Sequence, residues 1–285
     1  MFTDGSDKVG VIGLGIIGSR VAELLRLSER HVYVWNRSPK PVPNFVSSPA
    51  EMAQLADMIQ IFVPDGEALI EIVEAMKDKL TNKHVIINNS TVEPQAAADA
   101  YEIVHQTGAG FLDAPFTGSK LAAEKGALVY YVGGDPKTLE RTQPLLETSG
   151  KEVLFVGKVG EASVIKIATN MISAATVEIL SEAYGLVTAA GIEPGRLQEA
   201  MAHNACNSPL TSMKLPAIIE KDYDAHFSMK NMFKDSQYAL NLAKDFKIEL
   251  PALSTTASVM FRTIQKKNGD LDFCALAKNY QKSDA

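Results

Sequence analysis

The sequence is poor in cysteine and tryptophan and has no excess of positive charge. Its 285 residues include two Cys (Cys206 and Cys274) and one Trp, and 28 basic against 34 acidic residues give a net charge of −6. Two distant thiols without metal-ligand spacing exclude a disulfide framework and a cysteine metal site, and they fit a reducing cytoplasm. The acidic balance excludes the basic footprint of a nucleic-acid-binding protein.

Long hydrophobic runs, targeting signals and repeats are also missing. No apolar run is long enough to span a bilayer, and the first residues, MFTDGSDK, do not read as a signal peptide. The composition, 46% hydrophobic and 22% charged, is that of an ordinary globular protein with one large or two smaller domains. We therefore expect a cytoplasmic protein without membrane or nucleic-acid partners.

In the first half of the chain, apolar strands alternate with helical segments. This alternation implies right-handed crossovers and a parallel, doubly wound sheet, which is an α/β domain of Rossmann type. We place this domain at 1–160. The strands are expected at 8–12, 31–35, 58–63, 84–88, 110–115, 128–134 and 152–156.

The first predicted strand is followed at once by a glycine motif that opens a helix. Its residues are Gly13, Leu14, Gly15, Ile16, Ile17 and Gly18. In a dinucleotide site the first Gly permits the tight turn, the second lets the backbone approach a pyrophosphate, and the third lets helix and strand pack closely. The helix start then favours the phosphate charge. A purely structural turn is the alternative.

The end of the second strand indicates which dinucleotide binds. An acid usually stands there to hold the ribose 2′-OH of NAD, but this chain has Asn36, Arg37 and Ser38, with Lys40 close behind. A guanidinium can bind a 2′-phosphate in a bidentate manner, which favours NADP(H). The alternative is that Arg37 is a solvated loop residue.

Other strand ends carry further candidate residues. In doubly wound sheets ligands bind at the carboxyl ends of strands, where Val63, Pro64, Asp65 and Thr91 are expected. Thr117 and Gly118 follow the strand at 110–115, and a hydroxyl beside a glycine N–H can bind an anion. Each of these positions could instead be plain turn chemistry.

Residues 161–190 form the longest helical pattern of the chain, apolar nearly all round. Lys166 and Asn170 lie one turn apart on it, so an ammonium and an amide share one face. A buried Lys is costly without a partner, although a Lys near a helix start can also extend its head into water. After Gly191 only helical patterns follow, at about 194–204, 229–247, 251–267 and 271–281, with prolines such as Pro209 and Pro216 as punctuation. Residues 161–285 are therefore predicted to be an all-α domain joined to the first by this helix.

Taken together, the motifs resemble the β-hydroxyacid dehydrogenase family, which includes 3-hydroxyisobutyrate dehydrogenases and glyoxylate/succinic semialdehyde reductases. The resemblance covers nearly the whole chain, with its pieces in order. They are GLGIIG at 13–18, NSTVEP at 89–94, DAPFTGSKLAAEKGAL at 113–128, GKVGEASVIKIATN at 157–170 and FSMKNMFKD at 227–235. Thr-Gly-Ser-Lys at 117–120 is most similar to the glyoxylate/succinic semialdehyde reductases.

The resemblance implies roles for single residues. Lys166 matches the catalytic lysine and Asn170 its substrate-side partner, while Thr117 and Gly118 match the loop that holds the substrate carboxylate. Thr91 matches a residue at the nicotinamide and the substrate. The family also has a C-terminal element that closes over the site, and it is matched by Phe227, Lys234 and Asp235. Of these, Lys234 is assigned to the cofactor.

The expected reaction is hydride transfer from NADPH to a small aldehyde or keto acid with a carboxylate, with Lys166 as general acid and no metal. The resemblance also implies a homodimer or homotetramer. The alternatives are a 3-hydroxyisobutyrate or tartronate semialdehyde dehydrogenase, an imine reductase, and a catalytically silent NADP-binding scaffold. Three departures from the family pattern are Thr117 for Ser, Ala162 for Gly, and a short segment at 39–48 that is expected to be a loop.

Overall fold

The computed structural model describes residues 8–281. The chain divides into two compact units, Met1–Lys166 and Ile167–Ala285. Helix α7 (Glu161–Ala189) begins in the first unit and continues without a break into the second.

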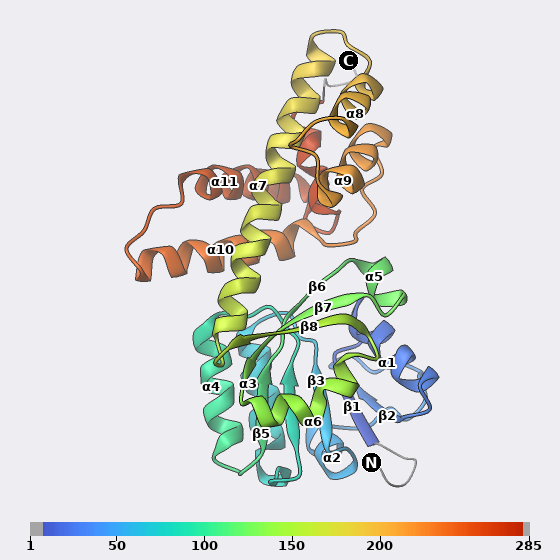
Figure 1. The fold of residues 1–285 in the computed structure, drawn as a ribbon, viewed down its shortest axis with the longest axis vertical. Coiled ribbons are helices and arrows are strands. Elements are labelled where there is room, and N and C mark those ends of the chain that lie inside the picture. Colours follow the sequence, from blue (N-terminus) through green and yellow to red (C-terminus); the bar gives the residue numbers. More distant parts are fainter. Residues whose placement is uncertain (1–7, 282–285) are drawn as a thin grey trace. The chain divides into compact units, whose positions relative to one another are not determined.

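The first unit is built on an eight-stranded sheet (Figure 1). The strand order is β2-β1-β3-β4-β5-β7-β6, and β8 pairs with β7. Strands β1 to β5 are mutually parallel, and the order reverses between β1 and β3, which is where doubly wound sheets bind their ligands. The strands are β1 Lys8–Ile12, β2 His31–Trp35, β3 Met58–Ile61, β4 Val85–Asn88, β5 Gly110–Asp113, β6 Phe116–Thr117, β7 Leu128–Gly134 and β8 Gly150–Gly157.

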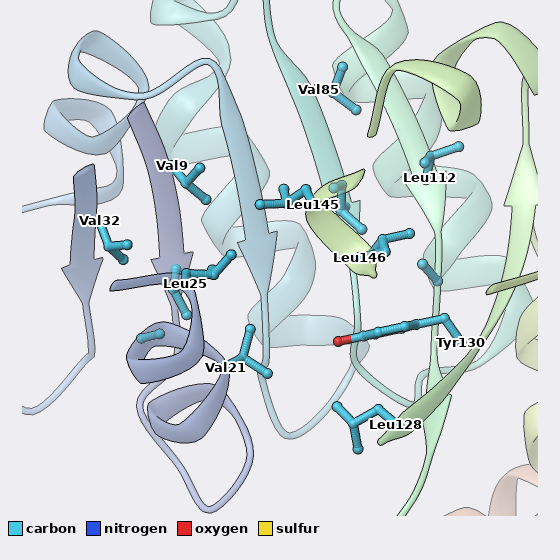
Figure 2. Packing of buried hydrophobic residues seen from close by; sticks show 14 of the residues in the cluster. Val9, Val21, Leu25, Val32, Val85, Leu112, Leu128, Tyr130, Leu145 and Leu146 are labelled. Atoms are coloured by element: carbon cyan, nitrogen blue, oxygen red, sulfur yellow. The ribbon is translucent and has the colours of Figure 1, made fainter. Parts of the chain in front are cut away.

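Helices pack on both faces of this sheet, because successive side chains of its strands point to opposite faces. On β1, Val9 and Val11 belong to one apolar cluster and Ile12 belongs to the other. The first cluster includes residues of α1, α5 and α6, and the second includes residues of α2, α3 and α4. Figure 2 shows part of the first cluster, with Leu25 of α1 and Leu145 of α6 among the labelled side chains. These helices are α1 Gly18–Leu27, α2 Pro49–Leu55, α3 Gly66–Met76, α4 Pro94–His105, α5 Lys120–Glu124 and α6 Pro136–Leu146.

The Rossmann-type architecture is confirmed, but the sheet is mixed rather than wholly parallel. Strand β7 runs antiparallel to both β5 and β6. Only residues 118–127 separate β6 from β7, and a parallel crossover needs about a dozen residues or more. The short link through α5 therefore permits only an antiparallel return.

The connection from β2 to α2 is irregular, as the short segment at 39–48 predicts. Phe45 forms an isolated bridge with Val34, so this segment lies along the outer edge of β2. Ser48 then caps α2 by accepting a hydrogen bond from the Glu51 N–H, and the Glu51 carboxylate accepts one from the Ser47 N–H. Pro49 occupies the first helical position, where its missing N–H costs nothing.

The second unit is helical within the described residues, with an isolated bridge between Ser228 and Asp272 as its only extended pairing. Its core packs one face of α7, including Ile167, Val177 and Tyr184, against the helices that follow. Helix α9 was not expected, because its two prolines suggest interruptions. Pro209 instead opens the helix, and Pro216 lies inside it. The segments are α8 Pro194–Ala202, α9 Pro209–Glu220, α10 Met229–Asp245, α11 Pro251–Thr263, a wide π turn Ile264–Asn268 and a 3-10 helix Phe273–Asn279.

Helix α7 corrects the expectation that no segment is long enough to cross a bilayer. Among the described helices it alone has the length and apolar composition to do so. The core helix of a soluble protein meets the same criterion, and α7 carries buried polar side chains such as Ser163, Glu178 and Ser181.

Candidate active site

The glycine turn between β1 and α1 has three glycines with different surroundings. Gly13 has a φ of +92°, and a Cβ there would lie 1.9 Å from the Phe62 carbonyl oxygen. A Cβ on Gly18 would lie 2.0 Å from the Gly13 carbonyl oxygen. A Cβ on Gly15 would have no atom within 4 Å. The outer glycines are thus required by the packing, whereas the middle one leaves the open space that a pyrophosphate needs.

The start of α1 can accept an anion. It has no side-chain cap and no acid in its first turn. The turn is braced from the end of β2, because the Leu14 N–H donates to Asn36 Oδ1 at 2.9 Å and the Lys40 ammonium donates to the Leu14 carbonyl. Asn36 therefore shapes the turn.

Arg37 and Ser38 follow Asn36 on the exposed side of this turn. Among the described residues the Arg37 guanidinium has no hydrogen-bond or ion-pair partner, and no carboxylate follows β2 closely. The Ser38 carbonyl accepts a hydrogen bond from the Asn36 side chain at 2.8 Å. An exposed cation without an acid at this position fits a 2′-phosphate better than a free ribose hydroxyl.

The ends of β3 and β4 are joined by hydrogen bonds. The Val63 N–H donates to Ser90 Oγ at 2.8 Å, and that hydroxyl donates to the Ile61 carbonyl. Asp65 caps α3 by accepting from the Ala68 N–H at 2.9 Å, and exposed Pro64 precedes it. Half-buried Thr91 follows Ser90. These residues lie at the same edge of the sheet as the glycine turn.

Thr117 is the last residue of β6, and Gly118 begins the loop that follows. Thr117 is half-buried, and Gly118 has a φ of +140°, a region that favours glycine. A Cβ on Gly118 would lie 2.8 Å from a methyl group of Leu128. Ser119 then caps α5 through the Ala122 N–H. The loop conformation thus depends on Gly118, beside the Thr117 hydroxyl.

Asp113, at the end of β5, is a residue of this edge that the sequence analysis did not single out. Its fully buried carboxylate accepts hydrogen bonds from the N–H groups of Gly160 and Ser163, both at 3.1 Å, and from the Ser163 hydroxyl. Burial raises the pKa of Asp113 to about 6, and hydrogen bonds from Ser163, Gly160 and Asn88 oppose that rise. A charged residue inside the apolar strand GFLDAP was the signal that could have revealed it.

Helix α7 carries Lys166 and Asn170, one turn apart. Their exposed fractions are 8% and 7%, so both side chains are buried. Ala162, at the position where the family pattern has Gly, packs with its methyl group toward Gly133 of β7. A Cβ at Gly133 would lie 2.2 Å from the Lys158 carbonyl oxygen, so the absence of one there lets the helix start come close.

In the second unit, three predicted residues form one chain of contacts. The Asn170 amide donates to Asp235 Oδ2 at 2.6 Å, and the Lys234 ammonium lies 2.9 Å from Asp235 Oδ1. The same ammonium lies over the Tyr238 ring, 4.5 Å from its centroid. Asp235 thereby fixes the orientation of the Asn170 amide and ties α7 to α10.

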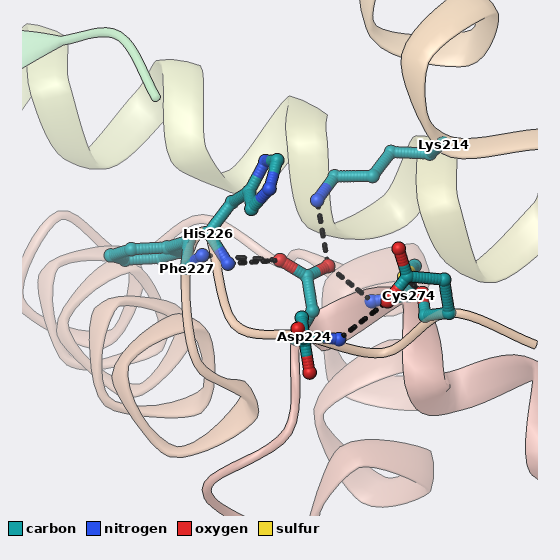
Figure 3. A network of polar contacts seen from close by, with 7 residues as sticks. Lys214, Asp224, His226, Phe227 and Cys274 are labelled. Carbon is teal, nitrogen blue, oxygen red and sulfur yellow. Dashed lines mark hydrogen bonds and ion pairs between the residues drawn. The ribbon is translucent and has the colours of Figure 1, made fainter. Parts of the chain in front are cut away.

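Phe227 belongs to a separate network around Asp272. Figure 3 shows how one carboxylate, that of Asp272, accepts from the Lys214 ammonium and from the backbone N–H groups of His226, Phe227 and Cys274. The Lys214 ammonium lies 2.6 Å from Asp272 Oδ1, and the Phe227 N–H donates to Oδ2 at 3.1 Å. This buried ion pair holds the loop before α10 and positions half-buried Phe227.

The two units thus gather different parts of the predicted site. The first brings the glycine turn, the residues after β3 and β4, and Thr117 with Gly118 to one edge of the sheet, while the second brings together Asn170, Lys234 and Asp235. No group of three or more His, Cys, Asp or Glu that could hold a metal ion occurs among residues 8–281.

A Rossmann-type unit with a GxGxxG turn, followed by a helical unit, is the architecture of a dinucleotide-binding protein and is typical of NAD(P)-dependent oxidoreductases. Residues 8–157 match the family model described as the NAD binding domain of 6-phosphogluconate dehydrogenase. Residues 160–280 match the model described as NAD-binding of NADP-dependent 3-hydroxyisobutyrate dehydrogenase. The chain belongs to the β-hydroxyacid dehydrogenase family, as its motifs predict.

Curated relatives agree with this assignment, and a solved structure shares the fold. Glyoxylate/succinic semialdehyde reductase 2 of Arabidopsis thaliana is 30% identical over 284 residues, which cover 95% of this chain and 79% of the relative. The 2-hydroxy-3-oxopropionate reductase of Escherichia coli K12 is 29% identical over 95% of this chain and 96% of its own length. The 3-hydroxyisobutyrate dehydrogenase of Mycobacterium tuberculosis shares the fold, with a TM-score of 0.88 at 22% identity, over 97% of this chain and 99% of that one.

Proposed function

We propose that this protein is an NADPH-dependent reductase of a small aldehyde or keto acid that carries a carboxylate, of the glyoxylate or succinic semialdehyde class. The similarity to relatives with such names supports the substrate class. The observation that carries the mechanism is the burial of Lys166, at 8% exposure, one turn before Asn170 on α7. A buried lysine is rare in a protein interior unless it is paired or functional.

The proposed cofactor is NADP(H), which when bound supplies the hydride. The glycine turn and the start of α1 would hold its pyrophosphate, with open space at Gly15. Arg37 and Ser38 would hold the 2′-phosphate. Val63, Pro64, Asp65 and Thr91 would line the nicotinamide side at the strand ends.

Lys166 is the proposed general acid. Thr117, the Gly118 N–H and Asn170 orient the carboxylate and carbonyl of the substrate. The Lys166 ammonium polarises the carbonyl oxygen and gives it a proton as the carbonyl carbon receives the hydride, so the product is an alcohol and the amine is reprotonated from solvent. Phe227 and Asp235 are further proposed substrate residues, and Lys234 is a further proposed cofactor residue. Asp235 keeps the Asn170 amide in one orientation.

The test is oxidation of NADPH, followed by absorbance, with glyoxylate, succinic semialdehyde, 2-hydroxy-3-oxopropionate and methylmalonate semialdehyde as substrates. A cyclic imine and NADH serve as comparisons. We expect one or two of the aldehyde acids to be reduced with NADPH preferred, and Lys166→Met to lower kcat by at least about 10²–10⁴-fold, as loss of a general acid does.

Lys158→Met is the matched control, because it makes the same substitution at an exposed position just before α7. It should retain wild-type turnover. Wild-type turnover by Lys166→Met would refute the proposed role of that residue. Tight NADPH binding by the wild type without turnover of any substrate would favour the silent scaffold, and reduction of the imine alone would favour an imine reductase.

A further inference from the structure

The carboxylate of Asp113 joins the start of α7 to the edge of the sheet. Oδ2 accepts hydrogen bonds from the N–H groups of Gly160 and Ser163, at 3.1 Å each, and the Ser163 hydroxyl contacts both carboxylate oxygens. The first N–H groups of a helix have no partner within the helix. A side chain from β5 therefore caps α7, with a negative charge at the positive end of the helix dipole.

The same carboxylate extends the network to the neighbouring strand. Asp113 Oδ1 accepts from the Asn88 side-chain amide at 3.2 Å, and the side-chain oxygen of Asn88, Oδ1, accepts from the Ser90 N–H at 3.0 Å. Next to it, the Asn89 amide donates to the Ala114 carbonyl at 2.8 Å. One buried network thus connects the strand ends that precede Thr91 and Thr117 with the first turn of α7.

We propose that Asp113 is a positioning residue for the reaction, because it fixes the first turn of α7, and with it Lys166, to the strand ends that carry Thr91 and Thr117. Ser163 and Lys166 are three residues apart on the helix and are neighbours on its surface. Misplacement of a catalytic group by about 1 Å can cost about 10²-fold in rate. The inference rests on the proposed role of Lys166 as general acid.

Asp113→Asn is the informative variant, because it keeps the size of the side chain but removes its charge and replaces one of the two acceptor oxygens by an NH2 donor. The side chain then cannot accept all the hydrogen bonds that the carboxylate accepts. We expect kcat to fall by about 10²-fold, with the Kd for NADPH unchanged. Ser163→Ala should give a smaller loss of the same kind, and it stands in for Asp113→Asn if that variant does not fold. The control is Ser149→Ala, at another fully buried hydroxyl, whose partners are the Tyr130 hydroxyl and the Leu146 carbonyl and none of the proposed site residues.

The decisive comparison combines Asp113→Asn with Lys166→Met. A residue that acts through Lys166 has no further effect on the residual rate once Lys166 is gone. A residue with a merely structural role would lower the residual rate by the same factor in both backgrounds, and that result would overturn the proposal. So would unchanged kcat in a folded Asp113→Asn protein.

Hydrogen exchange separates failure of this inference from failure of the proposed function. If the wild type reduces none of the substrates, the proposed function fails, but the amides of Gly160 and Ser163 can still be followed. They should exchange faster in Asp113→Asn and at the wild-type rate in Ser149→Ala. Unchanged exchange at both amides in Asp113→Asn would overturn the proposed positioning itself.

Discussion

Two buried aspartates, one in each unit, show how the partners of a carboxylate decide its effect on the fold. Asp113 accepts hydrogen bonds from N–H groups, a hydroxyl and an amide. Asp272 accepts from backbone N–H groups as well, but a lysine ammonium, that of Lys214, lies 2.6 Å away. Each organises a loop or helix start, with side chains almost wholly buried.

The pKa values of these aspartates shift in opposite directions. Burial raises the pKa of Asp113 to about 6, because its hydrogen bonds do not offset the desolvation of the charged form. Burial also raises the pKa of Asp272, but the charge of Lys214 and the hydrogen bonds from Lys214 and Cys274 outweigh it, and the net pKa is lowered. A neighbouring cation thus makes the difference between a carboxylate that resists ionisation and one that favours it.

The largest expected effect comes from removing that cation. Lys214→Met leaves Asp272 buried without its partner, and breaking a buried ion pair in this way typically costs about 3–5 kcal/mol of unfolding free energy. Urea denaturation followed by circular dichroism measures the loss. Alkylation of Cys274, which is buried beside Asp272 in the described structure, should become faster.

Lys230→Met is the control for this variant, since the ion pair of Lys230 with Asp270 is exposed. Exposed pairs contribute roughly 0–1 kcal/mol, so its midpoint in urea should stay near that of the wild type. If both variants lost the same unfolding free energy, burial would not be the reason why loss of the Lys214–Asp272 pair is costly.

We expect a smaller effect in the pH dependence of stability, and its direction should differ between the two aspartates. The folded pKa of Asp113, about 6, lies above its unfolded value of 3.8. Its contribution is therefore fully present below pH 3.8 and is lost as the pH rises to 6, by about 3 kcal/mol at most for a difference of about 2 units. The excess stability of the wild type over Asp113→Asn should shrink over that window.

Asp272→Asn should show the opposite slope. The lowered folded pKa of Asp272 means that its contribution is present above the ordinary carboxyl pKa and is lost as the pH falls through the folded value. Urea denaturation of the wild type and both variants from about pH 3 to pH 7 gives the two slopes. If the stability difference between wild type and variant changed with pH in the same direction for both aspartates, the opposite pKa shifts of Asp113 and Asp272 would be wrong.

Much of the fold follows from local patterns in the sequence. The bounds of β1, β2 and β7 and the start of α7 agree with the predicted segments, because each is an apolar run or helical pattern with clear punctuation. Helix α9 was missed, since Pro209 and Pro216 suggest breaks, yet the first proline is compatible with an N-terminal helical position and the second is accommodated within the helix.

The candidate site likewise contains residues that the sequence predicts and residues that it does not. Motif positions such as Gly13 and Lys166 can be read from the sequence, and their chemical roles stay predictions. Asp113 and the Lys214–Asp272 pair could not be assigned from sequence, because their partners lie about 50 residues away and are brought near only by tertiary packing. A charged residue within an apolar stretch signals that a buried partner exists, but it does not say which.

The smallest effect is expected for an exposed carboxylate, that of Glu124 on α5, which pairs with Arg20 of α1 at 2.8 Å. Arg20 also donates to the Ile16 carbonyl in the glycine turn, so this pair joins that turn to the helix after Thr117 and Gly118. A double-mutant cycle with Arg20→Gln and Glu124→Gln should give a coupling of only about 0.2–1 kcal/mol, which salt near 1 M should abolish. A coupling free energy of several kcal/mol, as expected for the buried pair of Lys214 with Asp272, would contradict this prediction, and so would a coupling that survives salt. Either result would mean that an exposed ion pair between two loops can stabilise the fold as much as a buried one.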